Sequence, residues 1–166
     1  GAWEEGVEFA RQSLARGIWN PKARNLETAL LRHLGRSKEA VESARKTAAL
    51  DALDFGCRQE LAFLGEPGAE EELEELLRGD GQNVLELMLG YREAGLKEDA
   101  EKVLEKIAPE EDFPMAFYYR YELTGDPADL AKAEACPGEY CFPNRLEDLE
   151  VLVLAAEAGG MQARYY

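Results

Sequence analysis

The chain has 166 residues, of which 46% are hydrophobic, so it is long enough and apolar enough to bury a continuous core. Its 34 acidic and 19 basic residues give a formal net charge of −15, which repels phosphate backbones and anionic lipid headgroups. Composition therefore argues against nucleic acids and membrane surfaces as partners. No apolar run approaches the roughly 20 residues that a membrane-spanning helix needs.

The three cysteines are Cys57, Cys136 and Cys141, and an odd number cannot pair completely within one chain. Their density is far below that of a disulfide scaffold, which favours a reducing, cytoplasmic compartment. The stretch from Cys136 to Cys141 could close a small disulfide loop or offer two thiolates to a metal, but its spacing is unusual for zinc and His33 is distant in the sequence. Plain thiols are favoured, and we expect no cofactor and no metal.

Apolar side chains recur at helical spacing in residues 3–14, and the pattern returns in 26–34, 96–107 and 146–156. No segment shows the sustained alternation that is typical of a half-buried strand. Helix breakers stand at Asn20-Pro21, Gly35, 51–54, 66–68, 79–81, Gly95, Pro109, 125–127, Pro137-Gly138, Pro143 and Gly159-Gly160. We therefore predict an all-α fold of roughly ten short helices without a sheet, in which successive helices are antiparallel neighbours.

A turn glycine followed five residues later by a small residue recurs along the chain. The pairs are Gly1 with Gly6, Gly35 with Ala40, and Gly95 with Ala100. The turn glycines Gly1 and Gly35 are 34 residues apart. A small residue also precedes an arginine at Ala23, Cys57 and Ala163, and the first two of these are again 34 residues apart. A glycine can end a helix in a left-handed cap, and a small residue lets the next helix approach closely. We therefore predict that Ala40 and Ala100 are buried at close helix crossings.

Paired helices with this period resemble the tetratricopeptide repeat, above all in residues 21–54, where Leu34-Gly35, Glu39-Ala40 and Leu50-Asp51 match the family's pattern. The resemblance implies an α-solenoid, a single module of antiparallel helix pairs that forms a right-handed superhelix. The expected repeats cover residues 1–20, 21–54, 55–80, 81–110, 111–140 and 141–160, and another begins at 161–166. Residues 55–80 are shortened and Leu130 stands where a small residue is expected, so those repeats should be irregular.

Two segments near the end, 141–147 and 162–166, are similar to the repeat region of large bacterial proteins that join such repeats to a β-rich, carbohydrate-enzyme-like domain. Repeat arrays need polar terminal repeats to cap their apolar faces, and neither end of this sequence shows one. We therefore expect the chain to be a fragment of a longer protein.

In the tetratricopeptide family the first helix of each pair lines a concave groove. The groove positions that the resemblance implies are Asn25, Ala29, Arg32, His33, Leu85, Leu89, Arg92, Met115 and Tyr119, of which we select Asn25, Arg32, His33, Leu89, Arg92 and Tyr119 as candidate binding residues. Only Asn25 fits the pattern of repeats that clamp a terminal carboxylate. A mixed apolar and basic groove that binds an acidic or aromatic segment is the favoured interpretation.

The aromatic stretch 113–121 has two interpretations. Phe117 and Tyr121 are one helical turn apart and should pack in the core, whereas Tyr118 or Tyr119 points elsewhere and could face a ligand. Core packing of most rings is favoured over a tyrosine that faces a ligand.

Catalysis finds little support in the sequence. The acidic run 70–75 is interrupted by leucine and is typical of the solvated face of an amphipathic helix. His33 is the single histidine and has no evident triad partner, and residues 79–83 lack the lysine of a phosphate-binding loop. We therefore expect a chain that is not an enzyme.

These observations predict a protein-interaction or scaffolding module whose partner is a protein or peptide segment, or another domain of the same parent chain. The alternative is a non-catalytic helical accessory region of a larger glycan-acting bacterial enzyme. A third interpretation is purely architectural, with helices packed on a neighbouring domain and no groove left open.

Overall fold

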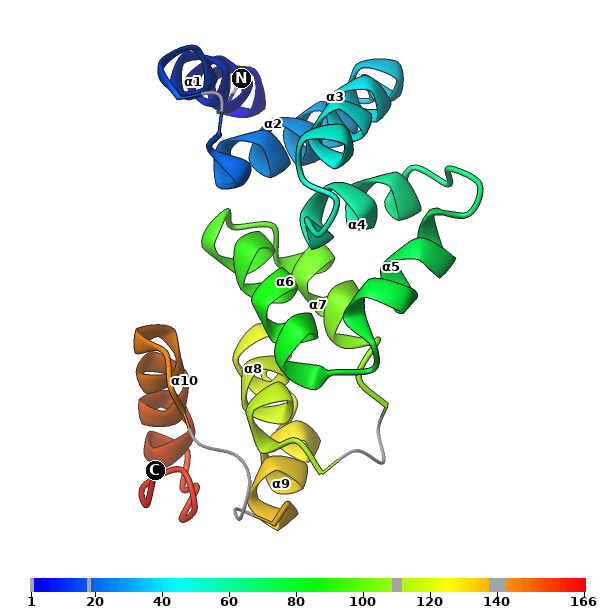
Figure 1. The fold of residues 1–166 in the computed structure, drawn as a ribbon. Coiled ribbons are helices and arrows are strands. Elements are labelled where there is room, and N and C mark those ends of the chain that lie inside the picture. Colours follow the sequence, from blue (N-terminus) through cyan, green and yellow to red (C-terminus); the bar gives the residue numbers. More distant parts are fainter. Residues whose placement is uncertain (1, 18, 109–111, 138–142) are drawn as a thin grey trace. The chain divides into compact units, whose positions relative to one another are not determined.

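The computed structural model describes residues 2–17, 19–108, 112–137 and 143–166, and every regular element in these ranges is an α-helix (Figure 1). The ten helices in this part of the chain are α1 (Ala2–Arg16), α2 (Pro21–His33), α3 (Ser37–Leu50), α4 (Phe55–Phe63), α5 (Ala69–Leu77), α6 (Gly81–Glu93), α7 (Lys97–Leu104), α8 (Pro114–Thr124), α9 (Pro127–Ala135) and α10 (Leu146–Glu157). The prediction of an all-α fold is therefore confirmed, and no strand occurs among the described residues.

The helices form two compact units. Unit 1 spans Gly1–Asp80 and holds α1 to α5, while unit 2 spans Gly81–Tyr166 and holds α6 to α10. The division into repeats stays a prediction. A superhelix that runs through both units stays a prediction.

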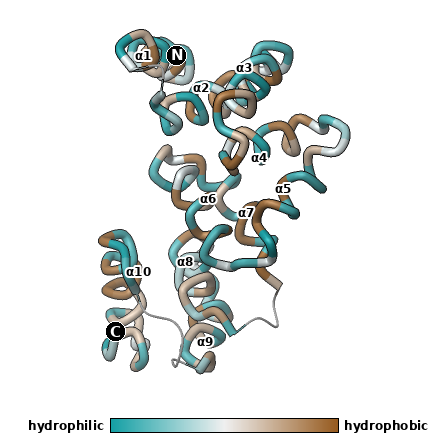
Figure 2. Tube along the Cα trace, viewed as in Figure 1, coloured by the Kyte–Doolittle hydropathy of each residue, from teal (hydrophilic) through white to brown (hydrophobic). Residues whose placement is uncertain are grey.

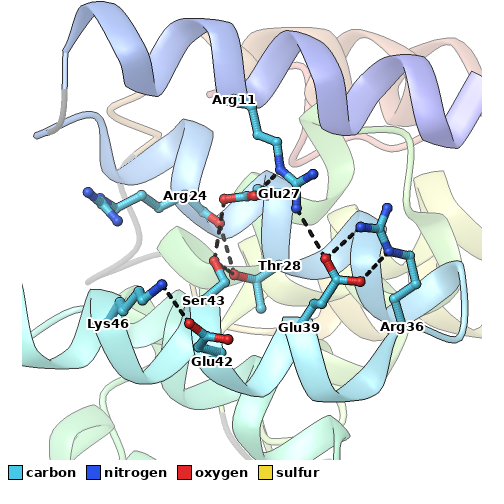
Figure 3. A network of polar contacts seen from close by, with 9 residues as sticks. All are labelled: Arg11, Arg24, Glu27, Thr28, Arg36, Glu39, Glu42, Ser43 and Lys46. Atoms are coloured by element: carbon cyan, nitrogen blue, oxygen red, sulfur yellow. Dashed lines mark hydrogen bonds and ion pairs between the residues drawn. The ribbon is translucent and has the colours of Figure 1, made fainter.

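In unit 1, consecutive helices are antiparallel, as predicted. Thr28 Oγ1 of α2 donates a hydrogen bond to Ser43 Oγ of α3 at 3.0 Å (Figure 3). Three residues later along α2, Leu31 shares a core cluster with Ala40 of α3. Residue numbers thus rise along α2 while they fall along α3. Arg11 of α1 forms an ion pair with Glu27 of α2 at 2.7 Å and also reaches Glu39 of α3 at 3.5 Å (Figure 3).

The first helices of successive pairs run in the same direction. Asn25 near the start of α2 contacts Asp54 just before α4, and Arg32 near the end of α2 contacts Glu60 near the end of α4. The two offsets, 29 and 28 residues, are nearly equal, which requires α2 and α4 to be parallel. In a repeat array, the first helix of each pair packs against the first helix of the next pair, as it does here.

Unit 2 repeats this plan. In the pair α8 and α9, Tyr118 donates a hydrogen bond to Glu134 at 2.7 Å, and Arg120 lies 4.0 Å from Asp129. From the first contact to the second, the residue numbers rise along α8 and fall along α9, so the pair is antiparallel. α10 packs against α8, where Tyr119 donates a hydrogen bond to Asp148 at 2.6 Å.

The turns between helices recur with a period of 30 residues. Gly35, Gly65, Gly95 and Gly125 all have positive φ, between 72° and 74°. At the first three glycines, the backbone N–H of the next residue donates a hydrogen bond to the carbonyl oxygen five residues before it. An example is the bond from Arg36 N–H to Leu31 O. These bonds are the longer bond of a Schellman cap, which a glycine with positive φ permits.

The difference between the 34-residue spacing in the sequence and this 30-residue spacing comes from the length of α4. The N-caps Asn20 and Asp54 are 34 residues apart, and each side chain accepts a hydrogen bond from the backbone N–H three residues later. α2 has 13 residues but α4 has only 9. The four missing residues are about one helical turn, so the ends of the two helices are closer in sequence than their starts.

Both alanines predicted at helix crossings are fully buried. Ala40 in α3 and Ala100 in α7 each have 0% exposure. Gly6 on α1 must also be small, because a Cβ atom there would lie 2.7 Å from Leu30 Cδ1. The recurring small residues therefore mark close approaches between helices.

Candidate protein-binding surface

Asn25 ties α2 to the start of α4. Its Nδ2 group donates hydrogen bonds to both carboxylate oxygens of Asp54, at 3.2 and 3.1 Å. Asp54 Oδ1 also accepts the N–H of Cys57 at 2.7 Å, so the asparagine steadies the cap of α4. Gly56 leaves room for this contact, because a Cβ atom there would lie 2.3 Å from Asn25 Nδ2. The side-chain amide of Asn25 therefore links α2 to the N-terminal end of α4.

Arg32 joins the same two helices further along. Its guanidinium donates from Nε to Glu60 Oε2 at 2.8 Å and from Nη2 to Oε1 at 3.1 Å. The side chains are 15% and 1% exposed, and the guanidinium lies over the Phe63 ring, 4.7 Å from its centroid. Bidentate pairing with a carboxylate neutralises the arginine. Arg32 therefore does not supply the positive charge expected for a basic groove.

His33 is exposed at the last residue of α2. Its ring stacks on Trp3 of α1, with centroids 4.9 Å apart and planes 12° from parallel. Trp3 is 42% exposed, although large aromatic side chains are usually buried. The stacked pair presents flat ring surface to solvent.

These side chains gather at one end of unit 1. Because α1 is antiparallel to α2 and α4 is parallel to it, the start of α1 and the ends of α2 and α4 meet there. We name this group the α2-end cluster, and its members are Trp3, Arg32, His33, Glu60 and Phe63. Its inner part is the buried ion pair, and its outer part is the aromatic stack.

The predicted groove residues of unit 2 are less accessible than the sequence suggested. Leu89 is 6% exposed and Tyr119 is 0% exposed. α10 packs against α8, and the Tyr119 hydroxyl donates to the carboxylate of Asp148. Burial, and then this hydrogen bond, raise the pKa of Tyr119. Neither side chain offers a surface to a partner, because both are buried.

The favoured interpretation of the aromatic stretch, core packing, is confirmed. Phe117 and Tyr118 are 1% and 0% exposed, and Tyr121 is half-buried. Tyr118 reaches Glu134 of α9 with its hydroxyl, so it points away from the Tyr119–Asp148 contact. The two adjacent tyrosines do point in different directions, but both directions are into the protein.

Arg92 is the counterpart of Arg32 in unit 2. Each lies three residues before a turn glycine, Gly35 or Gly95, and each forms a bidentate pair with a glutamate of the next first helix. For Arg92 the partner is Glu122, at 2.7 and 2.5 Å, and Glu150 lies 3.3 Å away. The hydrogen bond to Glu122 is the main cause that raises the pKa of Arg92. The expected basic groove is thus neutralised in both units by carboxylates that the groove prediction did not include.

The described residues offer few groups for reactions or for ligation. They contain no set of three or more His, Cys, Asp or Glu side chains placed to hold a metal ion. Burial raises the pKa of Cys57 to about 12, which keeps its thiol protonated and unreactive at neutral pH. The alternative of a disulfide between Cys136 and Cys141 falls outside the described residues, because Cys141 is not among them. No described helix is both long enough and apolar enough to cross a bilayer.

Comparisons with known proteins give one distant likeness to report. No protein-family model matches the chain, and no curated protein matches it. The crystal structure of a thermophilic tetratricopeptide repeat protein from Thermus thermophilus is similar over 94% of this chain and 90% of that chain, with 18% identity and a TM-score of 0.47. At this identity and TM-score the likeness assigns neither a family nor a function.

Proposed function

We propose that the chain is a protein-binding repeat module of the tetratricopeptide type, and that the α2-end cluster contacts the partner. The supporting observation is the exposed stack of Trp3 on His33, at an end where three helices meet. Exposed aromatic side chains that are held rigidly lose little conformational entropy on binding and are common anchors of interfaces. The partner is a peptide segment or another domain of the same parent chain.

The pairing of Arg32 changes the expected chemistry of the partner. Because Glu60 neutralises this guanidinium, an acidic partner has little to gain here. The rings of Trp3 and His33 favour a segment that places an aromatic or aliphatic side chain on them. Binding should therefore depend only weakly on salt, in contrast to a basic groove, whose attraction for an acidic segment would be screened beyond about 8 Å at physiological ionic strength.

The test uses peptides selected from a displayed random library against the whole chain, with affinities measured by calorimetry. Replacing Trp3 or His33 with alanine should weaken binding, by about 2 kcal/mol or roughly 30-fold for the tryptophan if it is an interface anchor. Trp19→Ala is the matched control, because Trp19 is 71% exposed and outside the cluster. Circular dichroism of each variant checks that the helices are retained. Equal affinities for the wild type, Trp3→Ala and His33→Ala would refute the placement.

The proposal also includes the absence of catalysis and a cytoplasmic location. The wild-type chain should turn over no substrate in a panel of glycosides, and it should not bind duplex DNA because of its net charge of −15. Turnover of any glycoside would show that the chain is an enzyme rather than a binding module or a non-catalytic accessory region.

A further inference from the structure

α10 carries an apolar stripe on its exposed side. Leu146, Leu149 and Val153 are 85%, 62% and 48% exposed. Their spacing of three and then four residues places them on one face of the helix, while Val151 and Ala155 face the core with 0% exposure. Apolar residues run along α10 in the hydropathy view (Figure 2). We name Leu146, Leu149 and Val153 the α10 stripe.

The residues after α10 do not cover this stripe. The backbone N–H groups of Gln162 and Ala163 donate to the carboxylate of Glu134 at 2.7 and 3.2 Å, which holds residues 161–166 against α9. The stripe is therefore exposed with that segment in place. A helix face that is apolar over two turns, on a chain that is 32% charged, is typical of an interaction surface.

Acidic side chains line one edge of the stripe. Glu150 and Glu157 are exposed, and at 100° per residue they lie beside Val153 on the helix surface. The side chain of Glu150 is 74% exposed, and its carboxylate lies 3.3 Å from the guanidinium of Arg92. A partner that buries the stripe must therefore bring its own apolar stripe and positive charge next to these glutamates.

We propose that the α10 stripe docks an amphipathic helix of another protein, one that carries Lys or Arg beside its apolar stripe. Helix packing in a groove or on a face uses side chains at positions i, i+3 and i+7, as the stripe does. This surface belongs to unit 2 and is separate from the α2-end cluster, so the inference does not depend on the proposed function. A second copy of the chain is a poor occupant, because a symmetric contact would place Glu150 and Glu157 of both copies close together.

The test uses the whole chain and three synthetic helical peptides of about 18 residues, which is five turns. All three carry leucines at spacings of three and four. The first is flanked by Lys and Arg, the second by Glu, and the third has the composition of the first in scrambled order. Fluorescence anisotropy of the labelled peptides gives the affinities. The first should bind, and the second and third should bind about tenfold more weakly or not at all.

The decisive variant is Leu149→Asp combined with Val153→Asp. It removes apolar surface and adds negative charge, so a purely electrostatic attraction of the basic peptide would become stronger. Docking on the stripe predicts the opposite, a loss of about tenfold or more. Leu154→Asp is the matched control, because Leu154 is 40% exposed and lies about 100° away from Val153 around the helix. It should leave the affinity nearly unchanged.

Charge reversal tests the second half of the inference. Glu150→Lys combined with Glu157→Lys should weaken the basic peptide and strengthen the acidic one. The proposal is overturned if the basic peptide fails to bind the wild type, or if it binds the double aspartate variant as well as the wild type. It is also overturned if sedimentation shows that the wild type is a dimer and that the double aspartate variant is a monomer, since a second copy would then occupy the stripe.

Discussion

Replacing Arg32 with methionine should destabilise unit 1 strongly, because it leaves the carboxylate of Glu60 without its bidentate partner. Glu60 is 0% exposed, and its side chain cannot turn to bulk water while the helices stay packed. Removing one member of a buried ion pair typically costs 3 to 5 kcal/mol, and we expect about 3 because Arg32 keeps 15% side-chain exposure and so some solvation. Methionine keeps an unbranched apolar side chain at this position, but it also removes the guanidinium that lies over the Phe63 ring.

The size of the effect makes it easy to observe. Unit 1 spans residues 1–80, so its unfolding entropy is about 170 cal/mol/K near its midpoint. A loss of about 3 kcal/mol then lowers the melting temperature by about 18 °C. The double change Arg32→Met with Glu60→Leu should restore most of the lost stability, because no buried charge remains without a partner.

Urea unfolding can separate the two units, because both tryptophans, Trp3 and Trp19, belong to unit 1. Their fluorescence reports on unit 1 alone, while far-ultraviolet circular dichroism reports on the helices of both units. Arg32→Met should lower the midpoint of the fluorescence transition at an unchanged slope. It should leave any separate transition of unit 2 in place.

The exposed pair of Lys46 with Glu42 provides the control. Its side chains are 65% and 68% exposed, so Lys46→Met should change the free energy of unfolding by at most about 0.5 kcal/mol. If Arg32→Met costs no more than this control, or if the double variant with Glu60→Leu is less stable than Arg32→Met alone, the buried pair does not hold α2 and α4 together in the way described.

Three further changes test the packing and the thiol. Replacing Ala40 or Ala100 with leucine should cost about 1 to 3 kcal/mol by overpacking, whereas Ala49→Leu at an exposed position should change the melting temperature little. Gly56→Ala should destabilise although alanine favours helix, because the new Cβ would lie 2.3 Å from the amide nitrogen of the asparagine that steadies α4. In a variant whose other two cysteines are serines, Cys57 should react with a thiol reagent at pH 8 only on unfolding. Its folded pKa of about 12 against an unfolded value of 9.0 also means that this group's contribution to stability is present below pH 9 and is lost as the pH rises towards 12.

The local features of the fold could be predicted because each depends on a few adjacent residues. Gly35 and Gly95 end helices because the left-handed conformation of the cap admits glycine most easily, and this requirement is visible in the sequence. Ala40 and Ala100 follow five residues later and are buried, since the turn fixes which face of the next helix meets the previous one. The 30-residue spacing of the turn glycines could not be predicted, because it arises from the loss of about one turn in α4, while the starts of α2 and α4 keep the 34-residue spacing that the sequence shows.

The candidate site could be predicted only in part, because accessibility depends on contacts about 30 residues away. The resemblance implies His33 as a groove residue and the side chain is exposed, but its stacking partner Trp3 lies on another helix and has no signal in the sequence near His33. Tyr119 has the ring and the hydroxyl that are typical of a ligand-facing residue. It is buried because α10 packs against it and Asp148 of that helix accepts a hydrogen bond from its hydroxyl.

The two arginines show why charge in a repeat array cannot be assigned from one helix alone. Arg32 and Arg92 were selected as groove cations from their helix positions, and those positions are indeed equivalent, three residues before a turn glycine. Each arginine side chain reaches the next first helix, about 30 residues later in the sequence, and forms a hydrogen bond with a glutamate there. A repeated arginine at this position, with a glutamate 28 to 30 residues later, is therefore typical of a link between stacked helices, and a free binding cation should be sought where that glutamate is missing.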